Sequence, residues 1–285
     1  MKKLTALLLA VLMIAGVLAG CASEPAQTSS STGPASEGSQ SAPNSETDDT
    51  ASKDGSKLII GLDDSFPPMG FRDDQNNLVG FDIDLAKEVG NRLGVEVEFK
   101  PIEWSTKELQ LDTDRIDMIW NGLSVNPERA EVMLLSRSYL ANSQVIVTIP
   151  SKNITKKSDL EGKKVAVQTG STAEEALAKD DISAKVGQVV QYADNVSALL
   201  DLKTGRIDAL VVDEVVAMYY AAKEDGVYTI LEESLAPEEY AIGFKKGNTE
   251  LCDKVIGALD EMIADGTAAK ISEKWFGEDK LLKAE

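Results

Sequence analysis

Three groups within residues 117–129 could together bind an anion. Gly122 offers a backbone N–H, Ser124 a hydroxyl and Arg129 a guanidinium. A guanidinium is planar and always charged, and its paired N–H donors match the two oxygens of a carboxylate. The spacing of these groups therefore predicts a carboxylate-binding site, provided that the backbone turns sharply after the strand 117–120 and points all three groups the same way.

A helix that begins just before Arg129 would strengthen such a site. Asn126 fits the N-cap position, Pro127 the first helical position and Glu128 the first turn. The unpaired N–H groups and the dipole at a helix N-terminus both favour a nearby anion. A second interpretation is that Arg129 merely pairs with Glu128 or Glu131 on the surface.

Composition limits the classes of function. The chain has 285 residues, 43% of them apolar, which suits a two-lobed body with appendages. A formal net charge of −19 argues against a nucleic-acid surface. Because the chain has no histidine, Ser-His-Asp and Cys-His catalysis and the commonest zinc ligand are excluded.

The N-terminal segment has the pattern of a bacterial lipoprotein. A basic start is followed by the apolar run 4–18 and then by Leu-Ala-Gly-Cys, which ends at Cys21. We expect residues 1–20 to be a signal peptide and Cys21 to be acylated and membrane-anchored. The alternative is an ordinary signal peptide with a chance cysteine. Cys252, in an apolar-periodic segment, is expected to be a small buried hydrophobe.

Residues 22–57 contain no Val, Ile, Leu, Met or aromatic residue. Such a segment cannot bury enough apolar surface to offset the entropy of ordering. We therefore expect residues 21–56 to be the lipidated cysteine and a disordered tether, with a globular head from residue 57.

The head alternates apolar strands with amphipathic helices, which predicts an α/β fold. The expected strands are 58–62, 95–99, 117–120, 143–147, 164–167, 188–191, 209–212, 228–231 and 240–244. The expected helices are 82–94, 109–111, one from residue 127, one from residue 173, 195–204, 214–223, 251–265 and 267–275. The segment 63–69 is expected to be an irregular loop.

Several motifs in this order resemble the polar amino acid substrate-binding proteins of ABC importers. They are Gly-Leu-Asp-Asp-Ser-Phe-Pro-Pro (61–68), Leu-Val-Gly-Phe-Asp-Ile-Asp-Leu-Ala (78–86), Gly-Leu-Ser with Arg129 (122–129), Gln-Thr-Gly-Ser-Thr (168–172), Arg-Ile-Asp-Ala to Asp (206–213) and Trp-Phe-Gly (275–277). The resemblance covers residues 57–277. It implies a type II periplasmic-binding-protein-like fold, in which two crossover strands join two α/β lobes around a ligand cleft. We expect lobe 1 to comprise 57–144 and 242–285, and lobe 2 to comprise 145–241.

The resemblance also implies how an amino acid would be bound. Arg129 would bind the α-carboxylate with help from Ser124, the Gly122 backbone and Thr172, while Asp213 would bind the α-ammonium. A zwitterion requires one fixed cation and one fixed anion, because either charge would be costly to bury alone.

The side chain of the amino acid would lie between the aromatic rings of Phe66 and Trp104. Asp63 would meet its polar end, with Gln168 and either Asn121 or Trp120 tuning the pocket. Asp63 can accept hydrogen bonds from an amide, a guanidinium, an ammonium or an imidazole. Acidic Asp64 and Glu103 favour a cationic ligand, neutral Gln168 also fits glutamine, and cystine remains open.

Some of these residues have a structural alternative. Asp213 could simply cap the helix 214–223, and Asp63 could be a turn residue that bonds its own backbone. Phe66 could pack a loop, and Trp104 could belong to the core.

The leading hypothesis is a non-catalytic, monomeric receptor on the outer face of the cytoplasmic membrane, without cofactor or metal. It would deliver glutamine or a cationic amino acid to an ABC transporter permease. One alternative is a lyase resembling cyclohexadienyl dehydratase, with Glu103, Asp63 or Glu174 as its acid. The other is a sensory input for a separate membrane kinase.

Overall fold

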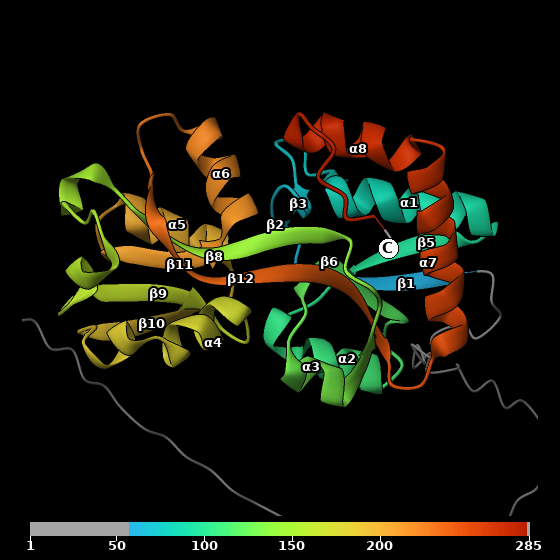
Figure 1. Cartoon of the computed structure of the whole chain (residues 1–285), viewed down its shortest axis with the longest axis horizontal. Coiled ribbons are helices and arrows are strands. Elements are labelled where there is room, and N and C mark those ends of the chain that lie inside the picture. Colours follow the sequence, from blue (N-terminus) through green and yellow to red (C-terminus); the bar gives the residue numbers. More distant parts are fainter. Residues whose placement is uncertain (1–56, 284–285) are drawn as a thin grey trace, which may run out of the picture. The chain divides into compact units, whose positions relative to one another are not determined.

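A nine-stranded sheet forms the framework of residues 57–283, the part of the chain that the computed structural model describes (Figure 1). The strand order is β10-β9-β11-β8-β12-β6-β1-β5, and β7 pairs with β12. The strands are β1 (Lys57–Leu62), β5 (Glu96–Pro101), β6 (Met118–Ser124), β7 (Met133–Leu135), β8 (Leu140–Thr148), β9 (Lys164–Gln168), β10 (Gln188–Tyr192), β11 (Ala209–Asp213) and β12 (Thr229–Lys245). A second sheet contains β2 (Ser65–Phe66), β3 (Gly70–Arg72) and β4 (Leu78–Val79).

Helices cover the main sheet on both faces. They are α1 (Phe81–Leu93), α2 (Lys107–Asp112), α3 (Pro127–Val132), α4 (Thr172–Lys179), α5 (Asn195–Lys203), α6 (Glu214–Lys223), α7 (Thr249–Ala264) and α8 (Thr267–Phe276). Four short 3₁₀ turns are η1 (Trp104–Thr106), η2 (Pro150–Lys152), η3 (Lys157–Leu160) and η4 (Asp181–Ala184). Strands β6 and β11 are buried along their whole length, as is typical of parallel strands covered on both faces.

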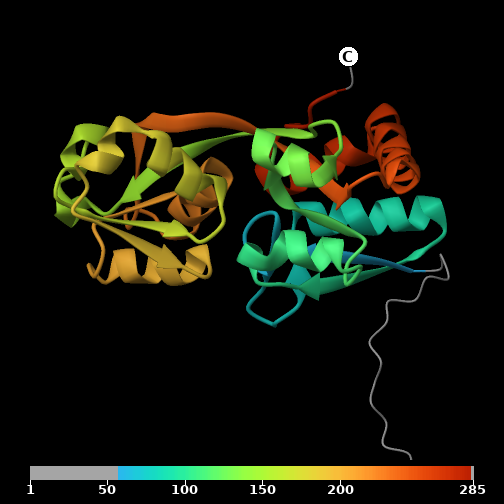
Figure 2. The same cartoon turned by 90° about the horizontal axis from the view of Figure 1, so that it is seen from below.

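The elements group into two α/β lobes, as predicted (Figures 1 and 2). The first lobe holds the parallel strands β1, β5 and β6 with α1, α2, α3, α7 and α8. The second holds β9, β10 and β11 with α4, α5 and α6. The long antiparallel strands β8 and β12 run side by side between them. Because the sheet is continuous through these strands, the boundaries at 144/145 and 241/242 remain a prediction.

Three local expectations were wrong. The chain does not turn at residues 121–122, because β6 continues to Ser124 through Gly122, whose positive φ of 59° the strand accommodates opposite a bulge in β12. The loop 63–69 contains β2. The strands expected at 228–231 and 240–244 are parts of the single strand β12, whose polar middle pairs with β8.

Other expectations hold. Asn126 caps α3 by accepting a hydrogen bond from the Arg129 N–H at 2.7 Å. Cys252 is a buried free thiol in the core. The signal peptide, Cys21 and the tether lie outside the described residues. Within 57–283, no helix combines the length and apolar character needed to cross a bilayer.

Candidate ligand-binding site

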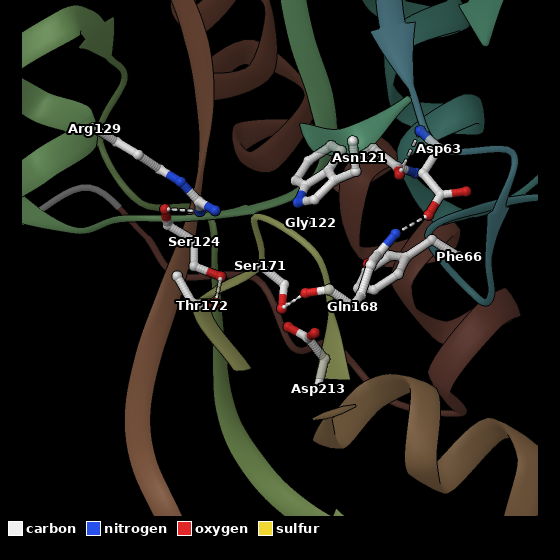
Figure 3. Close-up of a pocket in the computed structure, with 11 residues that line it drawn as sticks. Asp63, Phe66, Asn121, Gly122, Ser124, Arg129, Gln168, Ser171, Thr172 and Asp213 are labelled. Carbon is white, nitrogen blue, oxygen red and sulfur yellow. Dashed lines mark hydrogen bonds between the residues drawn. The ribbon is translucent and has the colours of Figure 1, made fainter. Parts of the chain in front are cut away.

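One cavity between the lobes brings together all ten residues predicted for the site (Figure 3). The space that these residues enclose, including solvent at its mouth, is about 270 Å³. Ser171, which was not predicted, also lines it. The lining residues are Asp63, Phe66, Trp104, Asn121, Gly122, Ser124, Arg129, Gln168, Ser171, Thr172 and Asp213.

Arg129 supplies a buried cation from the start of α3. Its side chain does not pair with Glu128 or Glu131, so the surface interpretation was wrong: the residue is 4% exposed and points into the cavity. Nη1 donates to the Ser124 carbonyl oxygen at 2.7 Å, and Nη2 donates to the Gly170 carbonyl oxygen of the second lobe at 3.5 Å. Burial lowers the pKa of Arg129. Among residues 57–283, this guanidinium forms no ion pair with a carboxylate.

Asp213 supplies a buried anion from the end of β11 in the second lobe. It precedes α6, but its side chain does not cap that helix. Instead, Oδ1 accepts from Asn142 Nδ2 at 2.9 Å and from the Tyr240 hydroxyl at 2.6 Å. Burial and then the nearby Glu238 carboxylate raise the pKa of Asp213 well above its usual value. In the described part of the chain, no lysine or arginine pairs with it.

Asp63 lies at the other end of the cavity, directly after β1. Oδ1 accepts from the Ser65 N–H at 2.9 Å, so Asp63 is the turn residue of one interpretation. Its other oxygen faces the second lobe and accepts from Gln168 Nε2 at 2.7 Å, as Figure 3 shows. Burial raises the pKa of Asp63 to about 6, although both hydrogen bonds oppose that shift. Asp63 therefore both bonds its own turn and presents a carboxylate oxygen in the cavity.

Gly122 lines the cavity, but its N–H is not available to a ligand. That N–H donates to Asp82 Oδ2 at 2.8 Å, which corrects the predicted role of the Gly122 backbone as a donor. A Cβ at Gly122 would lie 2.8 Å from the Phe66 ring. The absence of a side chain at Gly122 therefore allows the Phe66 ring to pack against β6. Asp82 also accepts from the Tyr139 hydroxyl at 2.9 Å. The sequence showed Asp82 within a motif but gave no reason to assign it this role.

Two of the aromatic residues considered for the site line the cavity, and the third lies only in the core. Phe66 and Trp104 line the cavity and are also buried, and Trp104 packs in a hydrophobic cluster with Leu111 and Ile116. Trp120 does not line the cavity. It is buried against Tyr139, with ring centroids 6.2 Å apart. Of the two alternatives for tuning the pocket, Asn121 is therefore the one that reaches it.

Hydrogen bonds connect the lobes around the cavity. Ser124 Oγ lies 3.0 Å from Thr172 Oγ1 and also donates to Glu238 Oε1 at 3.0 Å. Lys107 Nζ donates across the cleft to the Gly170 carbonyl oxygen at 3.0 Å. Lys107 is 2% exposed, and burial lowers its pKa. Sequence reasoning missed Lys107 and Glu238, since a charged residue in a polar segment usually indicates a solvated surface.

The acids considered for a lyase are not gathered in the cavity. Glu103 is exposed at the N-terminus of η1. Glu174 accepts hydrogen bonds from the Gly170 N–H and from Gln191, outside the lining. Only Asp63 of the three lines the cavity.

Comparison with known proteins identifies the family. The model of the bacterial extracellular solute-binding proteins, family 3, matches residues 58–278. An L-cystine-binding protein of Escherichia coli (strain K12) is 34% identical over 229 residues, which are 80% of this chain and 85% of that protein.

Two solved structures are similar as well. A substrate-binding protein of an ABC uptake transporter from Streptococcus pneumoniae, with bound histidine, is 39% identical with a TM-score of 0.77, covering 80% of this chain and 95% of that one. An ancestral arginine-binding protein bound to arginine is 41% identical with a TM-score of 0.74, covering 78% and 99%. The chain therefore belongs to the bacterial extracellular solute-binding proteins, family 3.

Proposed function

We propose that this protein binds a polar L-amino acid between its lobes and delivers it to an ABC importer. The observation that carries the proposal is the pair of buried, opposite charges in one cavity, Arg129 on the first lobe and Asp213 on the second. Neither has an ionic partner in the described chain, and an unpaired buried charge is costly. The α-carboxylate of an amino acid would satisfy Arg129, and its α-ammonium would satisfy Asp213.

The known binding partners of similar proteins support this class of ligand. The three proteins compared above are named or titled for cystine, histidine and arginine, each of which carries an α-carboxylate and an α-ammonium. In the proposed site, Arg129 and Asp213 would bind those two shared groups. The proposed role is binding without catalysis, with no cofactor.

The Asp63 end of the cavity should select the side chain. Its carboxylate already accepts from one amide, Gln168 Nε2, and the negative charges of Asp64 and Asp194 reinforce its negative field. A ligand that donates N–H groups fits there, whereas one with an acidic side chain would be repelled. We therefore propose a cationic amino acid or glutamine as the ligand.

Ligand binding should favour the closed arrangement of the lobes. The zwitterion would touch Arg129 on one lobe and Asp213 on the other, so both contacts exist only when the lobes are together. The permease would then recognise the closed form. We further propose that a lipid at Cys21 keeps the monomer at the outer face of the membrane, where the permease lies.

Thermal unfolding of the full chain tests the proposal. The protein, stripped of carried-over ligand by partial unfolding and dialysis, is heated with each of the twenty amino acids, ornithine, citrulline and cystine. A ligand that binds the folded form raises the Tm by mass action. We expect the largest shifts with arginine, lysine, histidine or glutamine, and none in Asp213→Asn. Absence of a shift with every compound would contradict the proposal, and turnover seen by mass spectrometry would point to the lyase.

A further inference from the structure

Glu238 places a second carboxylate behind the proposed ammonium site. It lies on β12, one of the two strands that run between the lobes, and is half-buried. Its Oε1 accepts three hydrogen bonds: from Asn142 Nδ2 at 2.6 Å, from Gln144 Nε2 at 2.9 Å and from Ser124 Oγ at 3.0 Å. So many donors on one oxygen fix the carboxyl group in place.

A single nitrogen bridges Glu238 and Asp213. Asn142 Nδ2 donates both to Glu238 Oε1 and, at 2.9 Å, to Asp213 Oδ1, so the two carboxyl groups flank one amide. In the described range, neither forms an ion pair. The other titratable groups facing Asp213 are the hydroxyl of Tyr240, which donates to it, and the guanidinium of Arg129 across the cleft.

Two carboxylates this close repel each other when both are ionised, and burial adds to the cost. Arg129 attracts both carboxylates across the cleft but forms no ion pair with either, because its guanidinium donates to the Ser124 carbonyl oxygen. A proton on Asp213 would relieve the repulsion. A ligand ammonium placed beside Asp213 would do the same.

We propose that Asp213, held beside Glu238, carries a proton when the cavity is empty and releases it when the ammonium group of an amino acid binds. The inference rests on the proposed function. The proton passes to solvent, and the N–H groups of the ammonium take its place. The positive charge of the ammonium then balances the carboxylate charge that the proton had balanced. No covalent bond other than that O–H is broken. Glu238 thus acts as a positioning residue for Asp213.

This exchange makes binding depend on pH. Protons compete with the ammonium, so affinity should fall as the pH falls, by up to tenfold per pH unit below the pKa of Asp213. Replacing Glu238 by Gln removes the repulsion but keeps a neutral hydrogen-bonding side chain. The fall in affinity should then begin at a lower pH, shifted by about one unit or more.

Calorimetric titration of the full chain tests the exchange. L-Arginine and L-glutamine are titrated between pH 5 and 8 in buffers with different ionisation enthalpies, which gives the protons released per ligand bound. The wild type should release a substantial fraction of one proton with either probe. Glu238→Gln should release fewer at the same pH and show the shifted affinity profile. Glu239→Gln, which changes the exposed neighbour on the same strand, should match the wild type.

A ligand without the amino group separates the pair from Asp63, whose carboxyl group also titrates near neutrality. The des-amino analogue of arginine, 5-guanidinopentanoate, keeps the guanidinium and the carboxylate. Any proton released by L-arginine but not by this analogue comes from the ammonium site.

Each result has a distinct meaning. Binding of L-arginine or L-glutamine without proton release, or with the same release from the des-amino analogue, would overturn the inference and leave the proposed function intact. A Glu238→Gln variant with weaker affinity but an unshifted pH profile would likewise reduce Glu238 to a structural role. If neither probe binds, and histidine and cystine also fail, the proposed function fails and the inference fails with it.

Discussion

Arg129 and Asp213 are held in opposite ways. The Arg129 guanidinium donates to backbone carbonyl oxygens at 2.7 and 3.5 Å, which leaves other N–H donors available. Asp213 accepts from an amide and a hydroxyl through Oδ1. Both side chains are oriented by hydrogen bonds with neutral groups rather than by ion pairs. At the scale of residues, the site is therefore preorganised for a charged ligand.

Arg129→Ala should weaken binding of L-arginine or L-glutamine at least 100-fold, since it leaves the ligand carboxylate buried without a cation; this is about 3 kcal/mol or more. The affinity of Arg129→Lys should lie between those of the wild type and Arg129→Ala, because lysine keeps the charge but cannot make two parallel hydrogen bonds. Calorimetry provides the dissociation constants. Arg206→Ala, at a side chain 67% exposed, removes the same charge from the surface and should leave affinity unchanged. Near-native affinity in Arg129→Ala would remove the carboxylate assignment.

Asp63→Asn should separate the two classes of ligand. For L-arginine, loss of the anion should weaken binding by roughly 10- to 100-fold, whereas L-glutamine should change by less than about tenfold because the variant still offers a carbonyl acceptor. In the wild type, affinity for L-arginine should also drop below pH 6, as the Asp63 carboxyl group takes up a proton. Equal effects on both ligands would show that Asp63 does not read side-chain charge.

The sequence predicted lining residues better than it predicted their partners. Arg129, Asp213 and Asp63 stand at ends of elements, where motif and spacing indicate a site. Their partners lie far away in the chain: Asn142 Nδ2 reaches Asp213 over 71 positions and Glu238 over 96. Such contacts depend on how β8 and β12 pair, which no local pattern reveals.

At the scale of elements, β6 and α1 are joined beneath the cavity by Asp82. This carboxylate at the start of α1 accepts from the Gly122 N–H in β6 and from the Tyr139 hydroxyl. The positive φ at Gly122 and the bulge in β12 beside it allow the strand to present its residues to the cavity. The sequence signalled a glycine-dependent bend here. It could not show that a strand continues through the bend, because the hydrogen bonds that sustain it come from β12.

Asp82 makes the folded protein sensitive to pH. Burial raises its pKa to about 7, against a usual value near 4 in the unfolded chain. A raised pKa means that the folded state holds the proton more tightly. The contribution of Asp82 to the free energy of unfolding is therefore fully present below pH 4. It is lost as the pH rises through 7, by up to about 4 kcal/mol.

Asp82→Asn should remove that loss, because an amide does not ionise and can still accept from the Gly122 N–H. Between pH 5 and 8, the free energy of unfolding in urea should therefore fall less in the variant than in the wild type. Asp253→Asn, on the exposed side of α7, should follow the wild-type curve. Parallel curves for wild type and Asp82→Asn would contradict the assignment of the buried proton.

At the scale of the molecule, the described structure is a closed arrangement of two lobes. Contacts from Lys107 to Gly170 and from Ser124 to Thr172 cross the cleft beside the cavity. A further contact lies away from it: the Phe71 ring of β3 meets the Tyr219 ring of α6 edge to face, with centroids 5.4 Å apart. Opening the lobes would break this contact without touching the cavity. It therefore reports on closure separately from ligand recognition.

Tyr219→Ala should weaken binding of L-arginine or L-glutamine by roughly 2- to 10-fold, which corresponds to the interaction free energy of one aromatic pair. The reason is that a ligand binding the closed state must also supply the energy of closure, and the variant makes that state less favourable. Calorimetry measures the affinity, and spin labels on the two lobes measure the distance between them. The ligand-free variant should be more open than the wild type. Met218→Ala, at the exposed neighbour on α6, should change neither quantity. A Tyr219→Ala protein with unchanged affinity and unchanged lobe distances would show that the Phe71–Tyr219 contact contributes nothing to closure, and that the polar contacts around the cavity hold the lobes together unaided.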